Sequence, residues 1–266
     1  TTSSTETLTC SVAGLSCGDT ITSDTNLSSD LNECNGDGLI IGADNIVLDC
    51  KGYAINGDDS GTDYGVKIDG NTNVTIKNCG ITDFNYGIYL IDSTSEDNLL
   101  FNNNLTSNIG GAIFHEDGAT GNIVRYNNSF GEIYWFGDGD LTIGNDLGFG
   151  SNLEITKNNI YFNTSAGSNY NRDANLSFFN LSLGDQIVPL KDGEECSKDV
   201  CSEITNISND YFFNVTGFTN YSITNASEAE LTSCNEPDFG NTLWRINSDC
   251  IVSSKTIKRE KGAKII

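Results

Sequence analysis

Basic residues are scarce in this chain: 14 lysines and arginines stand against 37 aspartates and glutamates, and the net charge is -23. A surface of this sign repels nucleic acid and anionic lipid, so both are excluded as partners. Methionine is absent even at position 1, and no apolar run is long enough for a signal peptide or a membrane span. We therefore expect a mature, exported protein without a membrane span, located outside the cell or on its surface.

Paired CxxC spacing is also absent among the nine cysteines, which argues against a zinc site and favours disulfides. Spacing leaves the connectivity open, although Cys196 with Cys201 and Cys234 with Cys250 are expected as local bridges. Since nine is odd, at least one thiol stays unpaired. Cys79, which lies inside a repeat, is expected to be this unpaired cysteine and to be buried as a small apolar side chain. The other eight are the disulfide candidates: Cys10, Cys17, Cys34, Cys50, Cys196, Cys201, Cys234 and Cys250.

Asparagine is abundant, and eleven Asn-x-Ser/Thr sequons occur without proline at the middle position. One sequon alone is weak evidence, but eleven together with the cysteines favour an exported glycoprotein that carries N-linked glycans. The candidate glycosylation sites are Asn26, Asn73, Asn104, Asn127, Asn163, Asn175, Asn180, Asn206, Asn214, Asn220 and Asn225.

A repeat organises the first half of the chain. Short strands that open with asparagine begin at positions 45, 73, 98, 122 and 152, and glycine-led strands cover 64–68, 86–90, 111–115 and 131–136. Strands this short bury a face only when successive turns stack with equivalent strands in parallel. The repeat therefore predicts a parallel β-helix, with a β-sandwich as the alternative. Corner asparagines are expected to stack their amides along the axis: Asn78, Asn103, Asn127 or Asn128, and Asn158.

The segments Cys17-Gly18-Asp19-Thr20-Ile21-Thr22 and 37–57, which runs DGLIIGADNIVLDCKGYAING, resemble the opening of NosD-like right-handed parallel β-helix repeat proteins, which are common among exported archaeal proteins. The resemblance covers about residues 15 to 165 and implies the fold. It does not imply an activity, because that family contains lyases, hydrolases, epimerases, adhesins and structural proteins. It also implies a cap before the first turn, with Ile21, Leu27 and Leu31 as its apolar face and Cys17, Cys34 and Cys50 as its staples.

The predicted fold class is all-β, in four parts. Residues 1–37 form an N-terminal extension and cap, 38–165 the right-handed parallel β-helix, 166–250 a smaller sandwich-like β domain, and 251–266 a basic tail. The tail carries five positive charges against one negative. Two interpretations stay open for it: a solvated, disordered end, or an added strand that docks on its own domain or on the next subunit. The predicted assembly residues are Lys255, Ile257, Lys258, Arg259, Lys261 and Lys264.

No residue set identifies a catalytic site, and neither a metal nor a cofactor is expected. The acidic residues Asp58, Asp59, Asp63, Asp69, Glu116, Asp117, Asp138 and Asp140 are interpreted as turn or solubilising residues. Nothing in the sequence identifies the single histidine, His115, as a general base, and Lys67, Lys77 and Arg125 are too few to make a basic cleft for a uronate. Within Tyr134-Trp135-Phe136 the middle ring faces away from its neighbours, so at least one face of this strand is expected to be covered.

Two functions follow from these patterns. The first hypothesis is a non-enzymatic structural glycoprotein that assembles with itself head to tail into a filament or layer, with glycans over most faces. The alternative is a carbohydrate-active β-helix, either a polysaccharide lyase or hydrolase or a glycan-binding adhesin. The alternative requires a face that is free of glycans and carries converging carboxylates.

Overall fold

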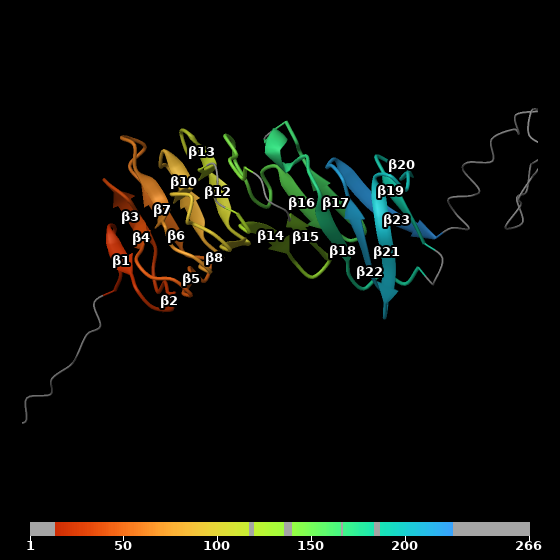
Figure 1. The fold of residues 1–266 in the computed structure, drawn as a ribbon, viewed down its shortest axis with the longest axis horizontal. Helices are drawn as coiled ribbons and strands as arrows, with labels where there is room; N and C mark the ends of the chain where they lie inside the picture. The colour runs from red at the N-terminus through yellow and green to blue at the C-terminus, as the bar shows by residue number, and fades with distance from the viewer. Residues whose placement is uncertain (1–13, 117–119, 136–139, 166, 184–186, 226–266) are drawn as a thin grey trace, which may run out of the picture.

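The computed structural model describes residues 14–116, 120–135, 140–165, 167–183 and 187–225. Within these ranges the chain is almost entirely β, with one short 3-10 helix, η1 (Ser168–Tyr170). A parallel part and an antiparallel part lie end to end along the long axis of the molecule (Figure 1). The predicted all-β fold with a parallel β-helix and a smaller C-terminal β region is confirmed.

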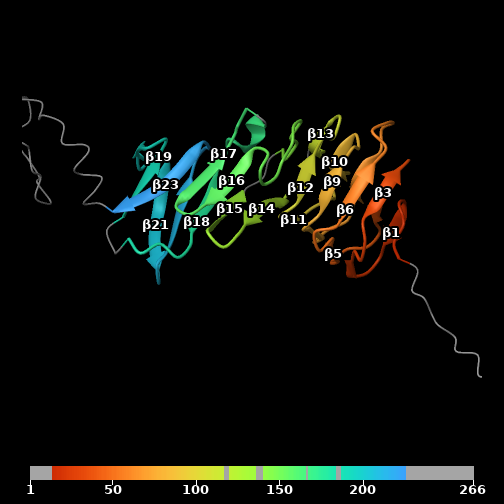
Figure 2. The same ribbon diagram turned by 180° about the vertical axis from the view of Figure 1, so that it is seen from behind.

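Three parallel sheets make up a solenoid of four turns and the start of a fifth, because each turn contributes one strand to each sheet. Sheet A contains β1 (Asp19–Ile21), β4 (Leu39–Ile41), β7 (Tyr64–Asp69), β10 (Tyr86–Ile91) and β13 (Gly111–His115). Sheet B begins with β2 (Thr25–Asn26), β5 (Val47–Asp49), β8 (Thr75–Lys77), β11 (Leu99–Phe101) and β14 (Ile123–Asn127). Sheet C contains β3 (Leu31–Cys34), β6 (Ala54–Gly57), β9 (Gly80–Thr82) and β12 (Asn104–Thr106), whose last three strands run side by side in Figure 2.

The solenoid core consists of equivalent side chains stacked from turn to turn. In sheet C, for example, Ile55 lies beside Ile81, and Ile81 beside Leu105, and all three are buried. Alternation along each strand sends one set of side chains into this stack and the other set to the surface. The residues expected to cap the stack, Ile21, Leu27 and Leu31, are buried in the first turn.

Buried asparagine amides join successive turns where the chain leaves its strands. In Asn103, Oδ1 accepts the backbone N–H of Cys79 at 3.1 Å, and Nδ2 donates to the carbonyl of Ile76 at 2.9 Å. The amide thus pairs with the backbone of the turn below as a neighbouring strand would. The same pattern, with partners 24 and 27 residues earlier, recurs at buried Asn98 and Asn122 and at half-buried Asn108.

The predicted stack of corner amides is only partly correct. Asn103 is one of the buried amides, and Asn127 accepts a bond from Asn102 on the adjacent turn at 3.0 Å. Asn78 bonds instead to Asp49, and Asn158 bonds to the backbone of Ile223. A single continuous column therefore does not form, because the corners bond to different kinds of partner.

The disulfides correct one prediction and confirm another. Cys79 was expected to be unpaired, but it bonds to Cys50, with 4.8 Å between their Cα atoms. The two residues are 29 positions apart and lie on adjacent turns, so the stacking brings them together. Cys17 pairs with Cys34 across the first turn, and the expected local bridge between Cys196 and Cys201 is present. Three further candidates, Cys10, Cys234 and Cys250, lie outside the described residues.

The parallel stack ends at β14. The next strand, β15 (Gly131–Trp135), pairs antiparallel with β14, so the prediction that 131–136 and 152–155 extend the parallel repeat is wrong. Sheet B continues through β18 (Ala174–Phe178), β22 (Asp210–Val215) and β21 (Cys201–Ile207). Sheet D contains β16 (Leu153–Thr156), β17 (Asn159–Phe162), β23 (Asn220–Asn225), β19 (Ile187–Lys191) and β20 (Glu194–Glu195). The division of the chain at residue 165 stays a prediction.

Residues 141–147 form a segment, here called the strap, which covers strand edges that would otherwise be exposed at this end of the solenoid. Ile143 exchanges two backbone hydrogen bonds with Ile113 of β13, and Leu147 exchanges two with Leu105 of β12. An uncovered edge presents unpaired N–H and C=O groups, so this strap closes sheets A and C. Within the strap, the side chains of Leu141, Ile143 and Leu147 are buried.

Aromatic side chains fill the core where the two parts meet. The Trp135 ring is fully buried, with edge contacts to Tyr126 of the solenoid and to Phe162 of sheet D. The expectation that one face of the 134–136 strand is covered is therefore confirmed for Trp135, while Phe136 lies outside the described residues. No helix in the described ranges is both long and apolar enough to cross a bilayer.

Replacing Asn103 with alanine is expected to destabilise the fold, because the N–H of Cys79 and the carbonyl of Ile76 would be left buried without partners. Each such group costs about 1–3 kcal/mol. The measurement is the urea midpoint of unfolding, with Asn35→Ala, at an exposed position, as the control. Equal midpoints for the two variants would show that the buried amide does not hold the turns together.

Removing the Cys50–Cys79 bridge with a C50A/C79A double variant is expected to lower the free energy of unfolding by roughly 3–4 kcal/mol, since it closes a long loop. The C196A/C201A variant opens a much shorter loop and should lose less. Peptide mapping without reduction checks the pairing first. Recovery of Cys50 and Cys79 as separate alkylated peptides would contradict it.

Candidate functional site

The outer surface of sheet A, here called face A, gathers side chains from adjacent turns. In β7, Val66 and Ile68 are buried and Lys67 points outward. The parallel register places Lys67 beside Tyr89 and Tyr89 beside Phe114, so the outward side chains form rows across the sheet. Face A comprises Ile40, Tyr64, Lys67, Asp69, Tyr86, Tyr89, Ile91 and Phe114, with Asp92 and Glu116 at the strand ends.

An aromatic ladder occupies the middle of face A. The Tyr64 and Tyr89 rings stack with centroids 3.8 Å apart, and Tyr89 stacks on Phe114 at 4.8 Å. Burial, and then the hydrogen bond with Tyr64, raise the pKa of Tyr89 to about 12, so its hydroxyl stays protonated. Because the rings stack along the direction in which strands succeed one another, their faces cover each other and their edges point to solvent.

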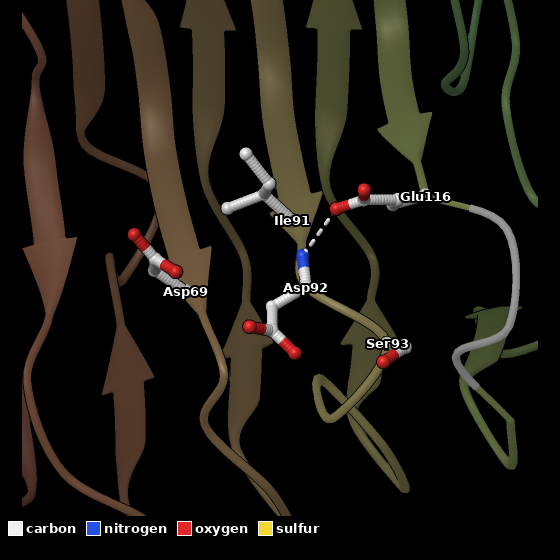
Figure 3. A pocket seen from close by; sticks show the side chains of 5 residues that line it. All are labelled: Asp69, Ile91, Asp92, Ser93 and Glu116. Atoms are coloured by element: carbon white, nitrogen blue, oxygen red, sulfur yellow. Dashed lines mark hydrogen bonds between the residues drawn. The ribbon is translucent and has the colours of Figure 1, made fainter.

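Three carboxylates lie at one end of face A, because parallel strands place their C-terminal ends at the same edge of a sheet. Asp69 ends the outward row of β7, Asp92 follows β10, and Glu116 follows β13 (Figure 3). With Ile91 and Ser93 they line a shallow hollow of about 510 Å³. Face A therefore combines aromatic edges with an acidic hollow.

Hydrogen bonds hold the acidic groups in place. Glu116 Oε2 accepts the backbone N–H of Asp92 at 2.5 Å, which Figure 3 marks with a dashed line. Asp92 Oδ1 accepts from the Thr94 N–H and from its hydroxyl, each at 2.9 Å, and these bonds lower the pKa of Asp92. Asp69 forms an ion pair with Lys67 at 3.1 Å.

This arrangement is suited to accepting hydrogen bonds. No cluster of three or more metal-ligand side chains occurs among the described residues. A general acid needs a raised pKa, whereas Asp92 is held ionised. Ionised carboxylates form strong hydrogen bonds with hydroxyl donors, and the tyrosine hydroxyls and the Lys67 ammonium add donors at the same face.

The sequons lie outside the strands of sheet A. Asn26, Asn127, Asn175, Asn206 and Asn214 are on strands of sheet B; Asn104 is on sheet C; Asn220 and Asn225 are on sheet D; Asn73, Asn163 and Asn180 flank strands of sheets B and D. No sequon therefore lies on a described strand of sheet A, although Asn73 lies in the turn from β7 to β8, shortly after Asp69.

The other acidic candidates mostly behave as turn residues, as expected. Asp58 accepts from the Ser60 N–H at 3.0 Å, and Asp140 from the Thr142 N–H at 2.7 Å. Asp59 has a positive φ of 57°, and the backbone carbonyl of Asp63 accepts the N–H of Asn85. Asp117 and Asp138 lie outside the described residues. Asp69 and Glu116 differ from this group because they line the hollow.

His115 and the three basic candidates do not form a site. His115 points into the solenoid, where its Nε2 lies 3.0 Å from Nδ2 of buried Asn122. Lys77 pairs with Asp49 at 3.5 Å and Arg125 with Glu132 at 2.5 Å, both on sheet B, whereas Lys67 is on sheet A. These three cations therefore do not meet in one cleft.

The sequence signal for face A was incomplete. The strands that carry Tyr64, Tyr89 and Phe114 are visible in the repeat, but their lateral register is not. Asp92 lies in the Asp92-Ser93-Thr94 turn, which resembles other turns of the chain and carries no separate signal. The predicted assembly residues Lys255, Ile257, Lys258, Arg259, Lys261 and Lys264 lie outside the described residues.

Glycopeptide mass spectrometry of the native protein is expected to find glycans on the exposed sequons Asn26, Asn104 and Asn206, and not on Asn214 or Asn225. The Nδ2 atom to which a glycan attaches already donates to Glu203 in Asn214, at 2.6 Å, and to the carbonyl of Leu183 in Asn225, at 2.9 Å. Occupancy at these two sites equal to that of the exposed group would contradict the expectation.

No family model, curated protein or solved structure matches this chain. The parallel β-solenoid is therefore described from its own strand pairing. The resemblance to NosD-like repeat proteins stays a prediction.

Proposed function

We propose that this chain is a non-enzymatic, extracellular glycoprotein that binds neutral polysaccharide through face A. The observation that carries the proposal is the contrast between faces: face A has no sequon and combines aromatic side chains with an acidic hollow, while sequons lie on sheets B, C and D. Of the two hypotheses drawn from the sequence, this contrast favours the glycan-binding one.

The chemistry of face A fits a saccharide. Vicinal hydroxyl groups are donors that a carboxylate can accept in pairs, and three carboxylates lie around one hollow. The tyrosine hydroxyls and Lys67 can donate to ring and hydroxyl oxygens of the same chain. Because the aromatic faces stack on one another, binding would depend on polar contacts and ring edges.

Charge selects the class of polysaccharide. A net charge of -23 and carboxylates on the face itself repel uronates and sulfated sugars. A neutral glycan avoids this repulsion. The disulfides indicate an oxidising environment, which agrees with a location outside the cell.

Self-assembly stays a separate prediction. The strands at the ends of sheet B do not offer a flat edge: β2 has two residues, and β21 carries a bulge between Ser202 and Thr205. Bulges and very short strands are features that prevent edge pairing. Assembly through the tail would depend on residues 251–266.

A glycan array tests the proposal, with the protein applied to neutral, uronic and sulfated polysaccharides side by side. Glu116→Gln and Asp69→Asn are expected to weaken binding to a neutral glycan about tenfold each, the factor given by about 1.4 kcal/mol. Asp199→Asn makes the same charge change at an exposed position in the C-terminal half and should bind as the native protein does.

Three outcomes would overturn the proposal: no neutral glycan bound, equal weakening by the Asp199 control, or preferential binding of uronates. Release of new reducing ends from the bound polysaccharide would replace binding with hydrolysis as the function.

A further inference from the structure

A second hollow, of about 470 Å³, lies between the strap and the loop that follows β17. Its polar lining comes from Thr142 and Asn145 of the strap and from Thr164, Ser165 and Asn169 of the loop. None of the described residues that line it is charged, in a chain that carries 37 acidic residues. Hydroxyl and amide groups without charge are suited to a neutral, hydroxyl-rich ligand.

One sequon contributes two of its three residues to the lining of this hollow. Thr164 and Ser165, which line it, are the second and third residues of the sequon of Asn163. The Asn163 side chain is exposed, and its Oδ1 accepts the N–H of Ser165 at 3.1 Å. That bond uses the oxygen, so a glycan can be attached to Nδ2 without breaking it.

The walls of the hollow are held by the fold before any ligand enters. Asn169 Nδ2 donates to the Thr142 carbonyl at 2.9 Å and to Asp140 at 3.0 Å, which ties the loop to the strap. The Asn163 N–H donates to the carbonyl of Asn152 at 2.9 Å and fixes the base of the sequon. Gly167 lies so close to the strap that an added Cβ would be 2.6 Å from Ile143.

We propose that the first sugar of an N-linked glycan on Asn163 lies in this hollow and holds the strap against the solenoid. The inference rests on the glycoprotein part of the proposed function. A sugar attached to Asn163 is present at high effective concentration, so weak polar contacts are enough to seat it. The sugar also stabilises the strap, because a ligand that binds only the conformation in which the strap is paired with the solenoid favours that conformation.

Hydrogen exchange of strap residues 141–147 tests this in protein from a glycosylating host. In the Asn163→Gln variant, the backbone amides of the strap are expected to exchange roughly tenfold faster than in the glycosylated native protein, the factor that about 1.4 kcal/mol gives. Ser182→Ala, which removes the sequon of Asn180, is the matched control and should leave the strap unchanged.

A second variant keeps the glycan and fills the hollow. Among the described residues, a Cβ added at Gly144 comes within 4.0 Å of the Gly110 carbonyl oxygen alone, so Gly144→Leu is expected to fold. Its strap should exchange as fast as in Asn163→Gln although Asn163 is still glycosylated.

Peptide mapping separates the possible failures. Absence of a glycan on Asn163 in the native protein would overturn the inference, and it would leave the glycan-binding part of the proposed function untouched. A glycosylated Asn163 whose loss, or whose displacement in Gly144→Leu, leaves strap exchange unchanged would overturn the inference while leaving the proposed function intact.

Discussion

This structure depends on one constraint: the buried backbone N–H and C=O groups between successive turns must all find hydrogen-bond partners. Within the strands, parallel pairing supplies the hydrogen bonds, but each turn also contains corners where the chain leaves the ladder. There, buried amides such as those of Asn98 and Asn103 accept an N–H and donate to a C=O of the turn below. A buried polar backbone group without a partner is costly, so these side chains allow the stack to continue without gaps.

The same constraint determines how the solenoid ends. A parallel stack that simply stopped would expose the edges of three sheets. Here the strap pairs with Ile113 and Leu105 at sheets A and C, and sheet B continues by an antiparallel strand into the C-terminal half. The buried aromatic cluster around Trp135 fills the space at this change of pairing. The two parts of the chain therefore share one sheet and one core.

Stacking also produces the surface that we assign to binding. Each turn adds one copy of an outward row, so side chains from β7, β10 and β13 repeat at the strand spacing and form the ladder and the acidic hollow. The strands of this face carry no sequon, whereas strands of the other sheets do. An acidic surface with oriented acceptors and few cations is suited to neutral hydroxyl donors.

The sequence by itself determined the parallel stack, because glycine-led alternating strands and corner asparagines are local signals that recur once per turn. It also determined the acidic character and the position of the sequons. Only the tertiary structure decided that Cys79 pairs with Cys50, that β15 reverses direction, and that Asp69, Asp92 and Glu116 meet. The physical reason is register: Tyr86 lies beside Tyr64 and Gly111, which are 22 and 25 residues away, so unequal turns conceal which side chains become neighbours.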